Sequence, residues 1–134
     1  MATTAAPPER GAYAERLLAL VNAARQQAGV APLQLHDDLN AAAREHSADM
    51  VARNYFSHFG PDGRTPWDRL AAEGVTTGGQ ENIAMGQATP EEAVESWMAS
   101  EGHRQNLLDP AFRFMGIGVQ TGADGAPRWT QTFA

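Results

Sequence analysis

The strongest constraint on the fold is a change in hydrophobic period along the chain. Through most of its length, apolar residues recur every three or four positions, which is the spacing of one helix face. Near the C-terminus, apolar residues instead alternate with glycine or polar residues over 114–120 and again over 128–133. The intervening Ala123-Asp-Gly-Ala126 has turn chemistry, so the two runs predict a β-hairpin. Helices followed by a small antiparallel sheet predict an α+β domain, an α-β-α sandwich.

Glycine, proline and capping residues mark the expected ends of the elements. Thr65-Pro66 and Thr89-Pro90 each combine a capping side chain with a proline at the first helical position. Asp37 or Asp38 can cap the helix that carries Leu39, Ala42, Ala43, His46 and Met50 on one face. The sequence predicts helices over about 12–28, 37–54, 66–74 and 90–102, an extended link over 30–35 and a short strand over 80–85.

Length and composition indicate one soluble globular domain. The chain has 134 residues, of which 43% are hydrophobic and 19% charged, enough to bury a core without cross-links. We expect a flexible tail over 1–11, a single domain over 12–134, and a monomer. A run of about 18 apolar residues is missing, so no transmembrane segment is predicted. The net charge of −6 argues against nucleic acid as a partner.

The chain contains no cysteine, which excludes disulfides, a thiolate nucleophile and cysteine-ligated zinc. This absence does not fix the cellular compartment. The N-terminus lacks a charged segment followed by an apolar one. Either the protein is not exported, or a start Met replaces its export signal.

Four polar residues in the middle of the chain form a candidate chemical centre: His58, Glu81, Glu101 and His103. Two imidazoles and two carboxylates suit a divalent-metal site or an acid–base cleft, provided that they converge in space. His58 lies in a loop that can face a cleft, although a surface His bonded to backbone is the plainer alternative. Glu81 follows Gly78-Gly79 and precedes apolar residues, so its carboxylate should be partly buried and should need a partner, either in a site or in an ion pair with an Arg.

The Glu101-Gly-His103 phrase is the sharpest local signal, since a helix ends there and Gly102 permits an unusual backbone angle. As a metal motif alone this spacing is weak. Glu95 is a rival for the second carboxylate, but Glu101 adjoins His103. The other two histidines favour plainer roles: His46 lies on an apolar helix face as a core residue, and His36 is expected to be solvated. Trp67, Trp97 and Trp129 are predicted to be core residues.

Taken together, these phrases resemble the CAP superfamily, the group of cysteine-rich secretory, antigen 5 and pathogenesis-related proteins, also called the sperm-coating-protein domain. The resemblance rests on the order and spacing of several motifs and covers the chain from about Tyr13 to Phe133. The motifs are Asn22-Ala-Ala-Arg25, Phe56-Ser-His58, Gly79-Gln-Glu81-Asn-Ile-Ala84, Trp97-Met-Ala-Ser-Glu-Gly-His103-Arg-Gln-Asn-Leu-Leu108 and Met115-Gly-Ile-Gly-Val119. The cysteine-free bacterial branch is the most similar in style.

The resemblance implies an α-β-α sandwich with an open cleft, and it implies that the four cleft residues of the family fall on His58, Glu81, Glu101 and His103. Many relatives carry the second Glu three residues after the tryptophan, where this chain has Ser100. That departure puts the role of Glu101 in doubt.

The expected function is that of an exported bacterial binding or defence-type module. His58 and His103 would bind a divalent metal such as Zn²⁺, with the two Glu residues orienting the imidazoles. Alternatives are a metal-assisted, protease-like hydrolase and a lipid- or sterol-binding carrier, so whether the chain is an enzyme stays open. We expect secretion or a location in the cell envelope, with a lipid, cell-wall material or a protein as the ligand.

Overall fold

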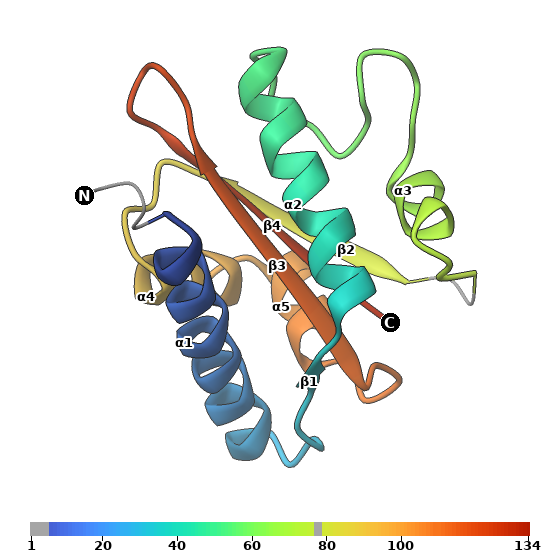
Figure 1. Ribbon diagram of the computed structural model, residues 1–134. Helices are drawn as coiled ribbons and strands as arrows, with labels where there is room; N and C mark the ends of the chain where they lie inside the picture. Colours follow the sequence, from blue (N-terminus) through green and yellow to red (C-terminus); the bar gives the residue numbers. More distant parts are fainter. Residues whose placement is uncertain (1–5, 77–78) are drawn as a thin grey trace.

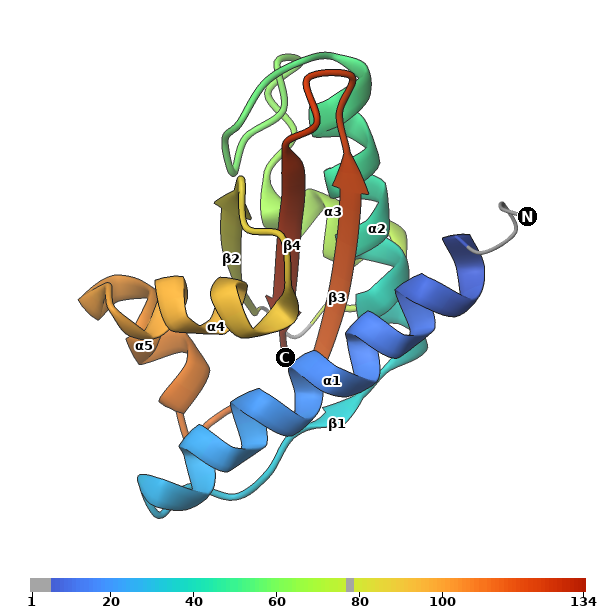
Figure 2. The ribbon, with the colours of Figure 1, turned by 90° about the vertical axis from the view of Figure 1, so that its left-hand side faces the viewer.

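The computed structural model describes residues 6–76 and 79–134, and it has three layers (Figures 1 and 2). A four-stranded sheet lies between α2 and α3 on one face and α1, α4 and α5 on the other. This arrangement confirms the predicted α-β-α sandwich. The elements are α1 (Ala6–Gln27), β1 (Gln34–Leu35), α2 (Asp37–Ala52), α3 (Pro66–Ala72), β2 (Gln80–Met85), α4 (Pro90–Met98), α5 (Glu101–Leu108), β3 (Phe114–Thr121) and β4 (Pro127–Phe133).

The sheet is mixed, with the strand order β1-β3-β4-β2. β3 and β4 form the predicted hairpin, and β2 pairs antiparallel with β4. The extended link expected over 30–35 contributes β1, which pairs parallel to β3 through two residues. The predicted small antiparallel sheet is thus extended at this edge by a short parallel strand, which was not predicted because two residues carry too little pattern to be recognised as a strand.

The helix boundaries follow the predicted caps with three exceptions. Thr65 and Thr89 accept hydrogen bonds from the backbone N–H of Asp68 and Glu92, as their capping role requires. α1 begins at Ala6 rather than Ala12, so part of the predicted tail is helical; residues 1–5 lie outside the described residues. α2 is capped by His36, whose Nδ1 accepts from Asp38 N–H, while Asp37 and Asp38 occupy the first turn.

The third exception is an additional helix. α4 ends at Met98, and α5 then begins at Glu101. Gly102 lies in the first turn of α5 and is not among the glycines with a positive φ, so it does not supply the unusual backbone angle expected of it. His103 therefore belongs to a short, separate helix, in which it is half-buried.

The main core lies between the sheet and the layer of α1, α4 and α5. Trp97 and Trp129 are fully buried there, as predicted. On the opposite face, α2 packs directly against β3, since a Cβ on Gly116 or Gly118 would collide with the α2 backbone at Leu39 or Ala43. Among the described helices, none has the length and apolar character needed to cross a membrane.

Candidate functional site

A cleft of about 340 Å³ opens at the β2 edge of the sheet. It brings together three of the four predicted site residues, each from a different element. His58 comes from the loop after α2, Glu81 from β2 and His103 from α5. The residues that line it are His58, Phe59, Pro66, Trp67, Gln80, Glu81, Ser100, Gly102, His103 and Asn106.

Glu81 is the buried centre of the cleft. Its side chain is only 2% exposed, and each carboxylate oxygen has its own partner. Oε2 accepts from His58 Nδ1 at 2.8 Å, and Oε1 accepts from Arg69 Nη2 at 2.8 Å. The site role and the Arg ion pair, which the sequence left as alternatives, are therefore both present. Gly78, one of the two glycines expected to shape the approach to Glu81, lies outside the described residues.

Gly79, the second of these glycines, has a backbone that only glycine adopts easily. Its φ is +154°, and a Cβ there would collide with the carbonyl oxygen of Phe133. The start of β2 therefore runs close to the end of β4. This close approach fixes the position of Glu81 two residues later.

The contact with Glu81 determines the tautomer of His58. A carboxylate can only accept, so Nδ1 of His58 carries the proton and donates it. In the neutral ring, Nε2 is then the atom with a free lone pair. The His58 side chain is 40% exposed, so this atom can meet a ligand in the cleft.

Two buried side chains hold the backbone that carries His58. His46 Nε2 lies 2.7 Å from the carbonyl oxygen of Ser57, and Arg69 Nη2 donates to the carbonyl oxygen of His58 at 2.8 Å. Arg69 was not recognised from the sequence as a site residue. A signal was present: Arg69 shares the buried face of α3 with Pro66 and Leu70, and an Arg at such a position needs an acidic partner.

His46 is a core residue, as predicted, but it also belongs to the surroundings of the cleft. It is fully buried, and its Nε2 lies 3.9 Å from Glu81 Oε2. Since Nε2–H donates to Ser57, Nδ1 is the acceptor nitrogen, and it has no hydrogen-bond partner among the described residues. Burial lowers the pKa of His46 despite the neighbouring Glu81 carboxylate, so the neutral ring is favoured.

His103 is tied to the sheet through its backbone and faces the cleft with its ring. The side chain of buried Asn82 donates to the carbonyl oxygen of His103 at 3.2 Å, and Asn106 donates to Asn82 Oδ1 at 2.9 Å. Partial burial lowers the pKa of His103, and the positive charge that His58 can carry lowers it further. The ring of His58 is thus close enough to lower the pKa of His103.

The second predicted carboxylate does not reach the cleft. Glu101 is exposed at the first position of α5 and is not among the lining residues, and the rival Glu95 is exposed on α4. Within residues 6–76 and 79–134, no group of three or more His, Cys, Asp or Glu side chains is arranged to hold a metal ion. The cleft therefore offers two histidines and one carboxylate that is already hydrogen-bonded.

Aromatic side chains form part of the cleft wall. Trp67, predicted to be a core residue, is 47% exposed, and Phe59 is 53% exposed. The indole N–H of Trp67 donates to the carbonyl oxygen of Gly79, which holds the ring beside the start of β2. The prediction for Trp67 was wrong because α3 is short and covers the sheet only partly.

Comparisons with known proteins agree with this fold. The model of the cysteine-rich secretory protein family, CAP, matches residues 18–133. The uncharacterized protein YkwD of Bacillus subtilis is 46% identical over 98% of this chain, and the uncharacterized membrane protein YlbC of the same organism is 38% identical over 78%. The match covers 50% of YkwD and 31% of YlbC, so this chain spans half or less of the length of these relatives.

Solved structures give the same result. An extracellular protein of Bacillus anthracis that contains an SCP domain superposes with a TM-score of 0.83 at 33% identity, over 92% of this chain and 40% of that one. An outer surface protein of Borrelia burgdorferi has a TM-score of 0.82 at 19% identity, over 89% of each chain, and supports the fold alone.

Proposed function

Because the chain belongs to the cysteine-rich secretory protein (CAP) family, we propose that it is an exported binding module whose cleft takes up a divalent metal ion, Zn²⁺ in the first place, through His58 and His103. Export is supported by the extracellular SCP-domain protein of Bacillus anthracis, which is 33% identical to this chain over the aligned region. The metal-binding role rests on the cleft itself.

The observation that carries the proposal is the 2.8 Å contact between His58 Nδ1 and Glu81 Oε2. Histidines that bind metals through one ring nitrogen almost always donate the other N–H to a carboxylate, carbonyl or water. Glu81 is buried and held by Arg69, so it fixes both the tautomer and the ring direction of His58. The free Nε2 of His58 and the ring of His103 then line the same cleft.

The donor set fits a two-histidine site better than a hydrolytic centre. Nitrogen ligands suit Zn²⁺, and the lowered pKa of His103 keeps its ring neutral and able to bind. A catalytic zinc usually has three protein ligands, and the described residues offer no third His, Cys, Asp or Glu in reach. When bound, the ion would polarise a ligand or water placed between the two histidines. This donor set favours a binding module over a metal-assisted hydrolase.

The proposal is tested by calorimetric titration of Zn²⁺ into protein prepared without a histidine tag. We compare the wild type with His58→Ala, His103→Ala and the control Glu101→Gln, whose side chain lies outside the cleft. Either histidine variant should lose at least about tenfold in affinity, and the control should bind like the wild type. Equal binding by all four proteins would place the zinc site elsewhere.

Two further measurements separate a functional site from a structural one. Affinity should fall as pH drops below about 6.5, where unperturbed imidazoles gain a proton. Because its pKa is lowered, His103 should keep its neutral form to a lower pH than a free histidine does. Chelator-treated protein should stay folded, because the main core around Trp97 and Trp129 contains none of the residues that line the cleft. Unfolding by chelator would contradict the proposal. Peptide and ester substrates, tested with and without Zn²⁺, report on the hydrolase alternative.

A further inference from the structure

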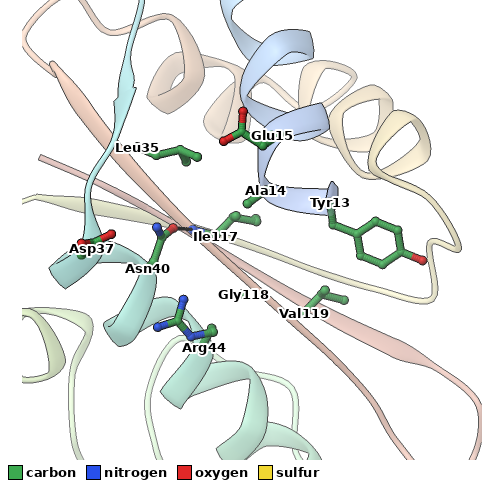
Figure 3. Close-up of a pocket in the computed structure, with 10 residues that line it drawn as sticks. All are labelled: Tyr13, Ala14, Glu15, Leu35, Asp37, Asn40, Arg44, Ile117, Gly118 and Val119. Carbon is green, nitrogen blue, oxygen red and sulfur yellow. Dashed lines mark hydrogen bonds between the residues drawn. The ribbon is translucent and has the colours of Figure 1, made fainter. Parts of the chain in front are cut away.

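Another cavity in the described part of the chain is larger than the histidine cleft and lies away from His58 and His103. It measures about 600 Å³ and runs along the free side of β3, between α1 and α2 (Figure 3). We call it the β3 groove and define it by Tyr13, Ala14, Asn40, Arg44, Ile117 and Val119.

The groove exists because β1 ends early. β1 pairs with Phe114 and Met115 only, after which the chain turns into α2. β3 continues to Thr121, and within the described residues no other strand accompanies it on that side. More than half of β3 is therefore an edge strand, with α1 and α2 standing on either side of it (Figure 1).

The direction of the backbone groups follows from the hydrogen bonds that are formed. The carbonyl oxygens of Arg113 and Met115 accept from the backbone N–H groups of Gln34 in β1 and of His36 directly after it. Phe114 instead exchanges hydrogen bonds with Ala134 beyond the end of β4. Successive residues of a strand point their amide groups to opposite sides. Ile117 and Val119 therefore present their backbone N–H and C=O groups to the groove.

Only one of these groups has a partner in the described structure. Asn40 Oδ1 accepts from the N–H of Ile117 at 2.9 Å, the contact drawn as a dashed line in Figure 3. The carbonyl of Ile117 and both backbone groups of Val119 have no hydrogen-bond partner among residues 6–76 and 79–134. Unpaired edge groups of this kind are a template for an added strand.

The two walls of the groove differ in chemistry. Ile117 and Val119 direct their side chains to the core shared with α1, and Tyr13 and Ala14 extend that apolar wall. The α2 wall is polar, with Asn40 and the exposed Arg44 beside Gly118 (Figure 3). Glu15 and Asp37 also line the groove, so its charges are mixed and Arg44 is the basic group at the Val119 end.

We propose that the β3 groove binds an extended peptide segment of another protein, which adds to the sheet as a strand next to β3. Its backbone would pair with the open carbonyl of Ile117 and with both backbone groups of Val119, as in other cases of strand addition. Side chains of an added strand alternate between the two walls. Apolar residues would therefore face Tyr13 and Ala14, and an acidic residue would face Arg44. A second copy of this chain fits less well, because each copy carries a net charge of −6.

The probe is a synthetic acetylated and amidated pentapeptide, Thr-Val-Glu-Val-Thr, titrated into the whole chain and followed by ¹H–¹⁵N NMR. The amide signals of Val119 and Thr121 should shift with a Kd below about 1 mM, the range of weak peptide recognition. The same peptide with N-methyl groups on alternate amides keeps its side chains but loses its backbone donors, and it should bind at least about tenfold more weakly. Equal binding of both peptides, or no shift in β3, would overturn the proposal.

Protein variants test the same contacts from the other side. Val119→Pro removes a donor that points away from β4, so it leaves the β3–β4 ladder intact and should abolish binding. Arg44→Glu should weaken binding of the acidic peptide at least about tenfold, whereas Arg104→Glu on α5, with the same charge change, should not. If the free protein instead dimerises in sedimentation and Val119→Pro makes it monomeric, the occupant is a second copy and the peptide assignment fails.

Discussion

The two edges of the sheet differ in whether their outward backbone groups have hydrogen-bond partners among the described residues. At the β2 edge, outward carbonyls are capped by side chains: Trp97 donates to Ile83 at 3.0 Å, and Asn106 lies 3.5 Å from the carbonyl of Glu81. At the β3 edge, Asn40 caps a single N–H and the following groups stay open. The capped edge carries the histidine cleft, and the open edge carries the β3 groove. At the β2 edge, side chains therefore already satisfy the outward backbone groups. At the β3 edge, open backbone groups are left for the added strand that we propose.

The two hollows also differ in how their charges are stabilised. Glu81 and Arg69 are both buried, with 2% and 4% of their side chains exposed, and each depends on the other. Glu15, Asp37 and Arg44 at the groove are exposed to solvent. Substitution of Glu81 or Arg69 at the cleft should therefore change stability as well as binding, whereas substitution of the exposed charged residues at the groove should change binding alone.

The largest effect is expected for Glu81→Gln. This change leaves the buried guanidinium of Arg69 without a countercharge, and loss of one partner of a buried pair costs about 3–5 kcal/mol. Arg44→Gln at the exposed groove is the matched control and should stay within about 0.5 kcal/mol of the wild type. Urea unfolding measures both free energies. A similar, small cost for the two variants would remove the distinction between the hollows.

The next largest effect is a pH dependence that originates at His46. Burial lowers its pKa in the folded state, so below about pH 6.5 the unfolded chain binds more protons than the folded one. The free energy of unfolding should therefore decrease as the pH falls below 6.5, by up to about 1.4 kcal/mol per pH unit, until the folded-state pKa is reached.

His46→Gln tests this origin, since Gln can still donate to Ser57 but does not titrate. Urea unfolding between pH 7.5 and 5 should give a shallower slope for this variant. Some slope should remain, because the pKa of His103 is lowered too. Parallel curves for variant and wild type would show that His46 does not contribute.

A smaller effect is expected when the one cap of the β3 edge is removed. Asn40→Ala leaves the N–H of Ile117 without its acceptor, and an unsatisfied, partly buried donor costs about 1–3 kcal/mol. Hydrogen exchange of the Ile117 amide should accelerate in parallel. An unchanged exchange rate would mean that the edge is already open at this residue, which would weaken the case for a single capped position.

The smallest effect is expected for Glu101→Gln. Glu101 is exposed at the first position of α5, where an acid interacts with the helix dipole by about 0.3–1 kcal/mol. Thermal unfolding should show a shift of that order, which disappears at high salt. A loss of stability comparable to that of Glu81→Gln would instead indicate that Glu101 contributes to the cleft.

Much of the fold could be predicted from the sequence because its signals are local. The caps at Thr65 and Thr89 and the alternation in β3 and β4 each lie within a few neighbouring residues. β1 and α5 could not be recognised in this way. β1 is two residues long and exists only through pairing with a distant strand, and α5 starts with a glycine in its first turn, which lowers helix propensity.

The residues of the candidate site also divide into those with a local sequence signal and those without one. His58, Glu81 and His103 stand in distinctive phrases, and the structure brings them to one cleft. Arg69 and His46 act through contacts between layers that no local pattern encodes, although an Arg on the buried face of α3 was a usable signal. Glu101 was selected for its neighbour in sequence, and the first turn of a helix turned its side chain outward.

The two glycines of β3 that touch α2 have a consequence for the cleft on the far side of that helix. With hydrogen atoms in place of side chains at Gly116 and Gly118, the α2 backbone lies flush on the strand. His46 lies on α2, so the position of this helix on the sheet also sets the position of His46. Because His46 contacts the carbonyl oxygen of Ser57, it also helps to set the position of the neighbouring His58. A single methyl group added at Gly118 would meet the backbone of Ala43 and Arg44. Because α2 or β3 would then have to shift, we expect a substitution at Gly118 to disturb His58 from a position that it does not touch.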